Sequence, residues 1–293
     1  MVTEALGLGL EVGAPPATPP LHGLRDSARE IAATDPRWEL GFRFQPESCG
    51  DVKAASELCD ALGTPFDDPD DIPAEQQNLP YVLYVPFMCD MQGQDLRDDR
   101  GRATRVLEAG TSKGMELQFW GDPLGTGNFS LVESTPATAG DAQTGASGVV
   151  GEGLSPRRGL ARLGQALAKC GVGSRGMIHA TVELASLWTV DGMLEVVGPR
   201  LETPVRGDIV VAGSGYDGSG PSGHVAAAPT ADLVWAYATG MVEYRLTEPR
   251  FEATALTEVV NRPQNEIEWH AQRTVGAAPD GCCAFAVLVD MTL

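Results

Sequence analysis

Lysine is the scarcest charged residue in this chain. The 293 residues include only three lysines, Lys53, Lys113 and Lys169, and Lys and Arg together number 21 against 40 for Asp and Glu. The formal net charge is therefore −19 at pH 7. A surface this acidic repels phosphate backbones and anionic lipid headgroups. The composition argues against sequence-independent nucleic-acid binding and against docking on a membrane. Simple solubility is the favoured explanation of the charge, and a surface that must lie near nucleic acid without adhering to it is the alternative.

Histidines and suitably paired cysteines are also scarce. The chain has four histidines and six cysteines, and no two cysteines are spaced as C-x-x-C, so the ligand spacing of a zinc site is absent. Cys282 and Cys283 are adjacent, which suits packing on the two faces of a strand. The first 20 residues lack a basic start, and no apolar run is long enough to cross a bilayer. We therefore expect a protein of the reducing cytoplasm with free thiols.

One segment resembles a nucleotide-binding motif. Gly213–Gly218 matches the dinucleotide fingerprint G-x-G-x-x-G and follows an apolar strand. That motif needs a helix N-terminus directly after it to hold pyrophosphate. The next residues, Ser219–Gly223, cannot begin a helix there, and Asp217 would repel phosphate. A flexible glycine loop is the favoured interpretation, and a nucleotide-dependent enzyme is the alternative.

The remaining chemical candidates have structural explanations. His179 lies in an apolar strand, which indicates a core histidine, because a general base would need a nucleophile or carboxylate oriented against it. The acidic run Asp67–Asp71 lacks the spaced ligands and closing glutamate of a calcium-binding EF-hand, so it is interpreted as a solvated loop. We expect no catalytic residue, no cofactor-binding residue and no metal ligand, and we do not expect an enzyme.

The first third of the chain is irregular. Residues 1–22 contain two proline pairs among small residues, which predicts an extended arm. We expect short helices over 22–33 and 52–62. Between them, Trp38–Phe44 alternates apolar and polar residues, which predicts a strand.

Leu79–Met91 is the first strongly apolar segment. Its aromatic and branched residues predict a strand or hairpin arm. Pro80 and Pro86 remove two backbone donors from it, so this strand should lie at a sheet edge or in a projecting ribbon.

Asp98–Trp120 keeps the apolar spacing of a long helix. Gly110 and Gly114 each cost about 1 kcal/mol relative to alanine in a helix. Each glycine marks either a close approach of another backbone or a tolerated solvent-facing position. The irregular stretch that follows, 121–153, is expected to hold one strand over Asn128–Glu133. A loop this long tends to be an interaction element.

The C-terminal half predicts an α/β layer followed by strands. Ser155 and Pro156 begin a helix that runs to Cys170. A buried strand follows over Gly176–Ala180, and Thr181 caps a helix that runs to Val190. Beyond Leu194 the pattern predicts only strands, over Asp208–Gly213, Leu233–Ala238, Val242–Leu246, Glu266–Ala271 and Cys283–Val289.

This order of segments resembles the major capsid proteins of tailed phages. Their fold is the Hong Kong 97 phage capsid fold, which encapsulin nanocompartments share. The resemblance covers about residues 35–293 and rests on pattern and order, without an invariant motif. Segments similar to the family's spine helix, extended loop, axial-domain helix and strand, and returning strands are Arg102–Gly121, Tyr81–Asp95, Ser155–Leu167, Gly176–Thr181, Trp235–Gly240 and Ala284–Leu288.

The resemblance implies an α+β fold with four parts. They are an N-terminal arm over 1–75, an extended loop over 76–97, a peripheral domain with the spine helix over 98–154 and 241–293, and an axial domain over 155–240.

The resemblance also implies a function without chemistry. Many copies would assemble through hexamers and pentamers into the icosahedral head shell of a tailed bacteriophage. The shell would be built in the host cytoplasm and would enclose double-stranded DNA without binding it specifically. Separate scaffolding, portal or decoration proteins would be its partners, and no membrane would be involved. The alternatives are an encapsulin shell that stores a cargo enzyme and another structural component of the virion.

Two features depart from some members of that family. Some shells are cross-linked through a lysine on the extended loop, but residues 79–96 contain no lysine. Many members carry a long N-terminal scaffolding segment, and the arm here is too short for one. We therefore expect shells without lysine cross-links and scaffolding, if used, from another chain.

Overall fold

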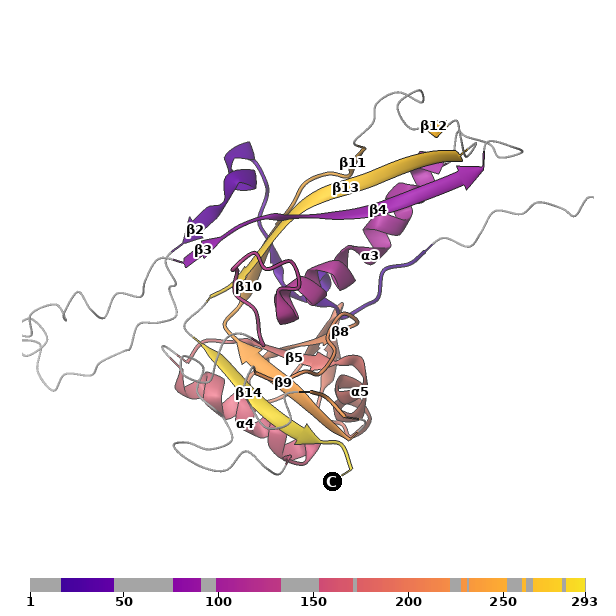
Figure 1. Ribbon diagram of the computed structural model, residues 1–293. Helices are drawn as coiled ribbons and strands as arrows, with labels where there is room; N and C mark the ends of the chain where they lie inside the picture. The colour runs from indigo at the N-terminus through magenta and orange to yellow at the C-terminus, as the bar shows by residue number, and fades with distance from the viewer. Residues whose placement is uncertain are drawn as a thin grey trace, which may run out of the picture.

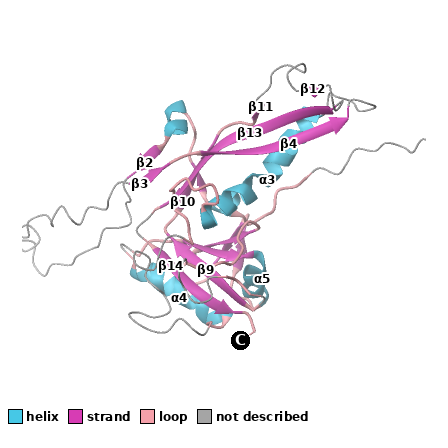
Figure 2. Cartoon of the chain, in the orientation of Figure 1, coloured by secondary structure: helices cyan, strands magenta, loops and turns pink. Residues whose placement is uncertain are grey.

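A computed structural model gives the fold of this chain and describes residues 17–44, 76–90, 99–132, 153–170, 173–221, 228–230, 232–251, 260–261, 266–280 and 283–292. These residues form two six-stranded sheets and one two-stranded sheet. Figure 1 shows a long upper layer that contains α3, β4 and β13, and a lower layer that contains β5, β8, β9, β14, α4 and α5. Figure 2 shows that helices and strands are mixed in both layers, as in an α+β fold.

The lower layer is built on one sheet, which we call the body sheet. Its strand order is β14-β9-β5-β8-β7-β6. β5 and β8 are parallel, and the other neighbours are antiparallel. The strands are β5 (Met177–Thr181), β6 (Glu195–Val197), β7 (Arg200–Glu202), β8 (Ile209–Gly213), β9 (Leu233–Thr239) and β14 (Ala284–Asp290).

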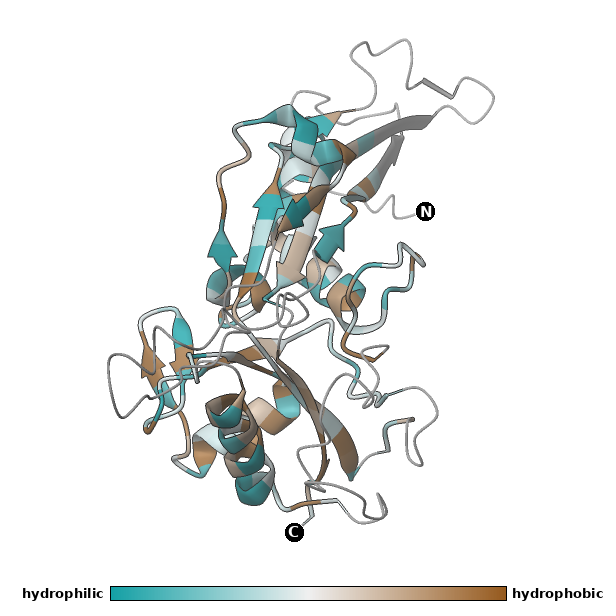
Figure 3. Cartoon of the chain, turned by 90° about the vertical axis from the view of Figure 1, so that its left-hand side faces the viewer, coloured by the Kyte–Doolittle hydropathy of each residue, from teal (hydrophilic) through white to brown (hydrophobic). Residues whose placement is uncertain are grey.

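Both faces of the body sheet are buried. In β9, Val234 and Ala236 belong to one apolar cluster, whereas Trp235 and Tyr237 belong to another. The first cluster includes α4 (Pro156–Lys169) and α5 (Val182–Val190), and the second includes the end of α3 (Asp99–Gly121). Strands buried on both faces read as continuous apolar runs, and Figure 3 shows such strands as predominantly hydrophobic in the lower layer.

The upper layer is built on a second sheet, which we call the ribbon sheet. Its longest strand, β13 (Glu266–Pro279), pairs with β4 (Tyr81–Asp90) from Glu266–Asp90 to Val275–Tyr81. Near its end, β13 also pairs with β10 (Val242–Leu246), and β10 pairs with β1 (Arg29–Glu30). Two short strands, β11 (Arg250–Phe251) and β12 (Val260–Asn261), pair with β13 as well. Among the described strands β4 pairs only with β13, so the predicted edge position of β4 is confirmed.

The long helix α3 lies against this ribbon, which confirms the helix predicted over Asp98–Trp120. One of its two glycines lies at that contact. A Cβ at Gly114 would lie 2.8 Å from Leu83 Cδ2, whereas a Cβ at Gly110 would meet nothing within 4 Å. Gly114 therefore lies against the Leu83 side chain of β4 and not against its backbone, and Gly110 is a tolerated glycine.

Two expectations in the N-terminal part were wrong. The helix expected over 22–33 is only α1 (Leu24–Ser27), because the chain then becomes β1. The strand expected over Trp38–Phe44 begins with a 3-10 helix, Pro36–Leu40, which starts where Asp35 accepts a hydrogen bond from the Arg37 backbone N–H. Only Phe42–Phe44 is extended, as β2, and it pairs with β3 (Gln76–Asn78). The expected helix over 52–62 and the acidic run Asp67–Asp71 lie outside the described residues.

The strand expected over Asn128–Glu133 is also wrong for its described residues, 128–132. The Asp122 side chain accepts hydrogen bonds from the backbone N–H groups of Thr126 and Gly127. Beyond this turn the N–H groups of Leu131 and Val132 bond to the carbonyls of Phe119 and Trp120. The segment folds back on the end of α3, so its backbone groups bond to the helix end and join no sheet.

The C-terminal strand lies in the body sheet. β14 pairs with β9 along its whole length, from Ala284–Thr239 to Asp290–Leu233. The sequence had grouped 284–290 with the peripheral segment 241–293. The strand is apolar on both sides, with Leu288 in one cluster and Val287 in the other. The helices packed on the two faces of the body sheet bury both sides of such a strand, which explains this placement.

Candidate functional site

The Gly213–Gly218 segment is a contact with α3. No helix follows β8 in the described residues up to 221, so a phosphate would find no helix N-terminus there. A Cβ at Gly215 would lie 2.6 Å from the carbonyl oxygen of Lys113. The glycine therefore lets the loop approach the backbone of α3, and packing explains the spacing that resembled a nucleotide fingerprint.

His179 lies in the core with both ring nitrogens bonded. Nδ1 lies 2.9 Å from the Tyr216 hydroxyl, and Nε2 lies 2.9 Å from Thr239 Oγ1. The side chain is fully buried, and burial lowers the pKa of His179 to about 3. The imidazole is therefore neutral at physiological pH, and its two partners are hydroxyl groups. This environment is that of a hydrogen-bonded core histidine, as the strand pattern indicated.

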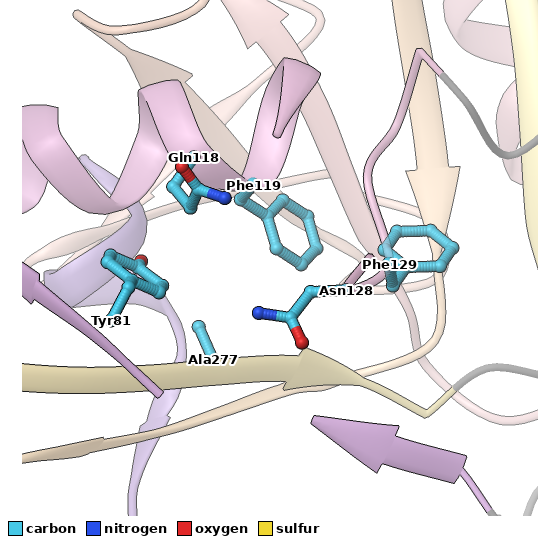
Figure 4. Close-up of a pocket in the computed structure, with 6 residues that line it drawn as sticks. All are labelled: Tyr81, Gln118, Phe119, Asn128, Phe129 and Ala277. Atoms are coloured by element: carbon cyan, nitrogen blue, oxygen red, sulfur yellow. The ribbon is translucent and has the colours of Figure 1, made fainter. Parts of the chain in front are cut away.

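Two hollows among the described residues are poor ligand sites. The space bounded by Tyr81, Gln118, Phe119, Asn128, Phe129 and Ala277 (Figure 4) is too small to hold a water molecule. An open hollow of about 530 Å³ lies beside Trp38, Phe42 and Arg245. Its carboxylate, Asp35, is paired with Arg37. Within the described part of the chain, no group of three His, Cys, Asp or Glu side chains could hold a metal ion.

A buried carboxylate joins the two layers of the molecule. Glu116 of α3 is fully buried. Its Oε1 accepts hydrogen bonds from the Leu24 backbone N–H and the Ser112 hydroxyl, each at 2.9 Å. Its Oε2 accepts from the Ser214 hydroxyl at 3.1 Å and the Gly215 backbone N–H at 2.9 Å. We call this set the Glu116 junction, because it holds α1, α3 and the loop after β8 together.

A charged cluster lies about two turns earlier on α3. Glu108 is paired with Arg273 of β13 and, at 2.9 Å, with Arg25 of α1. Burial alone would raise the pKa of Glu108, but hydrogen bonds and charge from Arg273 and Arg25 lower it below its usual value. Arg273 is itself almost fully buried. The cluster fixes both α1 and the ribbon to the same face of α3.

The ribbon has one covered face and one exposed face. Leu83 and Val85 pack toward α3 with Ala103 and Leu107. The intervening side chains Val82, Tyr84 and Pro86 are exposed, with 43% of Val82 and 65% of Tyr84 accessible. We call Val82, Tyr84 and Pro86 the ribbon face. Val82 and Tyr84 are thus apolar side chains left accessible on one face of β4, which makes this face a candidate contact surface.

Sequence reasoning missed the two polar clusters on α3. Glu116 lies among apolar residues of α3, and its neighbours Met115 and Phe119 are buried. A single acid inside such a stripe was the available signal for a buried carboxylate. Its partners lie 92 and 99 residues away in the sequence, at Leu24 and Gly215, and no local pattern identifies them.

In the described part of the chain no helix is both long and apolar enough to cross a membrane.

No protein-family model and no curated protein matches this sequence. Solved structures do match over nearly the whole chain. The capsid of an empty GTA particle has a TM-score of 0.52 and 10% identity, covering 99% of this chain and 97% of that chain. A chain from Mycobacterium phage Bobi has a TM-score of 0.51 and 12% identity, covering 98% and 97%. A chain from Mycobacterium phage Adephagia has a TM-score of 0.51 and 11% identity, covering 97% and 96%. The α+β fold of this chain is therefore that of phage capsids, the Hong Kong 97 capsid fold.

Proposed function

We propose that this chain is the major capsid protein of a tailed bacteriophage. Many copies assemble through hexamers and pentamers into an icosahedral head shell in the host cytoplasm, and the shell encloses the DNA genome in the virion. The observation that carries the proposal is the capsid fold over nearly the full length, joined to a ribbon with a bare apolar face. The protein acts as a building unit and catalyses no reaction.

The ribbon face supports self-assembly on physical grounds. A two-stranded ribbon is marginally stable in water unless another element covers it. Here α3 covers one face, and Val82 and Tyr84 remain exposed on the other. A second copy of this chain is the partner present at the highest concentration during assembly. Covering the ribbon face with that copy would bury its apolar side chains and stabilise the ribbon.

The layers of the structure support a division into capsid domains. The body sheet with α4 and α5 would be the axial domain, and the ribbon sheet with α3 would be the peripheral domain. Segments 1–75 and 76–97 would be the arm and the extended loop. The pairing of β14 with β9 argues for grouping 284–290 with the axial domain.

The charge of the chain supports a shell that encloses DNA without holding it. With a net charge of −19, most of the surface repels phosphates, and the packaged genome would make no specific contact. Scaffolding, portal and decoration proteins would be separate chains.

The decisive experiment is electron microscopy of the purified protein together with analysis of what the particles contain. We expect closed icosahedral shells, with DNA in particles from phage-infected cells. Particles that enclose a co-purifying enzyme would instead support the encapsulin alternative. A copy number of a few per virion would identify another virion component. A monomer that stays compact and fully stable at high concentration would contradict a shell protein of any kind.

A further inference from the structure

Two cysteines that the sequence predicted to be free are bonded to each other. Cys170 caps the C-terminal end of α4, and Cys283 directly precedes β14. They form a disulfide with a Cα–Cα distance of 5.9 Å and a sequence separation of 113. A separation of 5.9 Å lies in the usual range for disulfides. In the structure this pair is oxidised, which differs from the free thiols that the composition predicts.

Packing around the pair brings the two cysteines together without help from the bond. Gly159 of α4 lies against Val289, where a Cβ would come within 2.8 Å of the valine Cγ2. Just before α4, Leu154 exchanges backbone hydrogen bonds with Leu288 and Asp290 of β14. At the other end of the strand, the Gly240 N–H donates to the Cys283 carbonyl. The helix and strand are thus docked by contacts that remain when both cysteines are thiols.

The two cysteines differ in exposure. Cys283 is 5% exposed, whereas Cys170 is partly exposed at the helix end. A small oxidant can therefore reach Cys170 first, and the neighbouring Cys283 can complete the reaction. This is the arrangement of an attacking and a resolving thiol within one chain.

As a capsid subunit, the chain would pass from the cytoplasm to the outside of the cell, and the bond would have a different redox state in each place. Cytosolic thiols are kept reduced, while disulfides persist on particles outside the cell. We propose that Cys170 and Cys283 form an oxidation site, present as two thiols while the chain assembles in the cytoplasm and as an intrachain disulfide after the particle is released. The two-compartment history rests on the proposed function, but the site itself rests only on the geometry of α4 and β14.

The reaction balances with a small-molecule disulfide as oxidant. The Cys170 thiolate attacks the oxidant, forms a mixed disulfide and releases one thiolate. The Cys283 thiolate then attacks the Cys170 sulfur, forms the protein disulfide and releases the second thiolate. The protein loses two electrons and two protons in total, and the oxidant gains them as two thiols.

The bond would fix one edge of the body sheet. β14 is the terminal strand of that sheet, and among the described strands it pairs only with β9. Edge elements of a fold open before its centre does. A covalent link from β14 to α4 prevents this strand from separating, so oxidised particles should resist unfolding better than reduced ones.

The test compares two preparations of the same assembled protein. One is purified from cells that are lysed in an alkylating agent, and the other is incubated with oxidised glutathione. Peptide mass spectrometry should find alkylated Cys170 and Cys283 in the first and the Cys170–Cys283 link in the second. The thermal unfolding midpoint of the second should be higher by about 5–10 °C, and a reductant should remove the difference.

Variants separate this site from the other cysteines. C170S/C283A should abolish the reductant-dependent shift, whereas C89S, which leaves both cysteines of the pair in place, should retain it. If the double variant does not fold, the comparison of wild-type protein with and without reductant gives the same information.

Three results would overturn the proposal. They are a Cys170–Cys283 bond already complete in the alkylated lysate, free Cys170 and Cys283 after oxidation, and a midpoint that does not respond to reductant. If microscopy showed no shell but the bond and the shift were found in the soluble protein, the proposed function would fail and the oxidation site would stand.

Discussion

The body sheet and the ribbon sheet use the same kinds of residues in opposite ways. In the body sheet, helices α4 and α5 cover one face and the end of α3 covers the other, so strands such as β9 are almost fully buried. In the ribbon, α3 covers one face only, and every second residue of β4 from Val82 to Pro86 is exposed. The body sheet completes its core within one chain, whereas the ribbon leaves part of its apolar surface exposed.

This difference shows where stability and assembly should separate. Burying apolar surface stabilises a fold by about 25 cal/mol per Å². Substitutions in the body sheet should therefore act on folding of the single chain. Substitutions on the ribbon face should act on association and leave the folded chain unchanged.

Trp235→Ala should cause the largest loss. Trp235 is 1% exposed in β9 and belongs to the cluster shared with α3. Removing a buried aromatic side chain leaves a cavity and costs about 3–5 kcal/mol. Denaturant unfolding of the unassembled chain measures this loss. A cost below about 1 kcal/mol would mean that this face of the body sheet is not a packed core.

Glu116→Ala should cost about 3 kcal/mol and should also uncouple the two layers. It leaves three buried donors and the exposed Ser214 hydroxyl without their acceptor, and hydrogen bonds to a charged group are worth about 1.5–3 kcal/mol each without adding fully. We expect the unfolding transition to broaden or divide into two. Glu116→Gln is the matched control, because one amide oxygen can still accept, so its loss should be smaller. A single sharp transition with equal losses for both variants would contradict the junction.

Acid should weaken the two layers in different pH windows. The folded pKa of His179 is about 3, below the ordinary 6.5 of an unfolded histidine, so between these values only the unfolded chain binds the proton. Falling pH therefore reduces stability by about 1.4 kcal/mol per unit below pH 6.5. The pKa of Glu108 is lowered from 4.5, so its contribution is lost only as the pH falls below that value.

Unfolding curves at several pH values, with signals from each layer, would separate the two windows. His179→Gln should remove the dependence between pH 6.5 and 4.5 and leave the one below it. If wild-type stability were flat between pH 7 and 5, His179 would not be a buried neutral group.

Tyr84→Ala should change the stability of the single chain by less than about 0.5 kcal/mol, because surface substitutions rarely do more. The same change should reduce the yield of shells, measured by sedimentation or microscopy. Tyr84→Phe keeps the apolar ring and should assemble normally. Normal assembly of Tyr84→Ala would show that the ribbon face is not covered by a second copy.

The elements predicted well are those determined by neighbours in sequence. The helix over Asp98–Trp120 and the strand at Leu79–Met91 follow from periodicity and proline positions, and both are present. The segment 128–132 was misassigned because its backbone donors bond to Asp122 and to the end of α3, a contact that apolar alternation does not reveal. Asp35 and Pro36 similarly replaced the first half of a predicted strand with a helical turn.

The features that could not be predicted depend on distant partners. The Glu116 junction joins residues more than 90 positions apart, and the Cys170–Cys283 bond spans 113. The position of β14 could not be predicted either. An apolar strand can complete either of the two sheets, and contacts with residues distant in the sequence determine which one it joins. The ribbon face was predicted in part. Pro80 and Pro86 indicated an edge strand, but which face of β4 is exposed depends on the position of α3.

The helix α3 packs in both layers, so a change of its tilt in the body sheet would move the end that carries the ribbon. Its first half packs with the ribbon at Ala103 and Leu107, and its last turns pack into the body core at Met115 and Phe119. Its 23 residues span about 34 Å at 1.5 Å per residue. A tilt of about 5° at the body end would therefore move the far end by about 3 Å, the width of one atom. If the chain assembles as proposed, small rotations where the layers meet would change the direction of the ribbon toward neighbouring copies, and the tilt of α3 in the different copies of one shell would measure this directly.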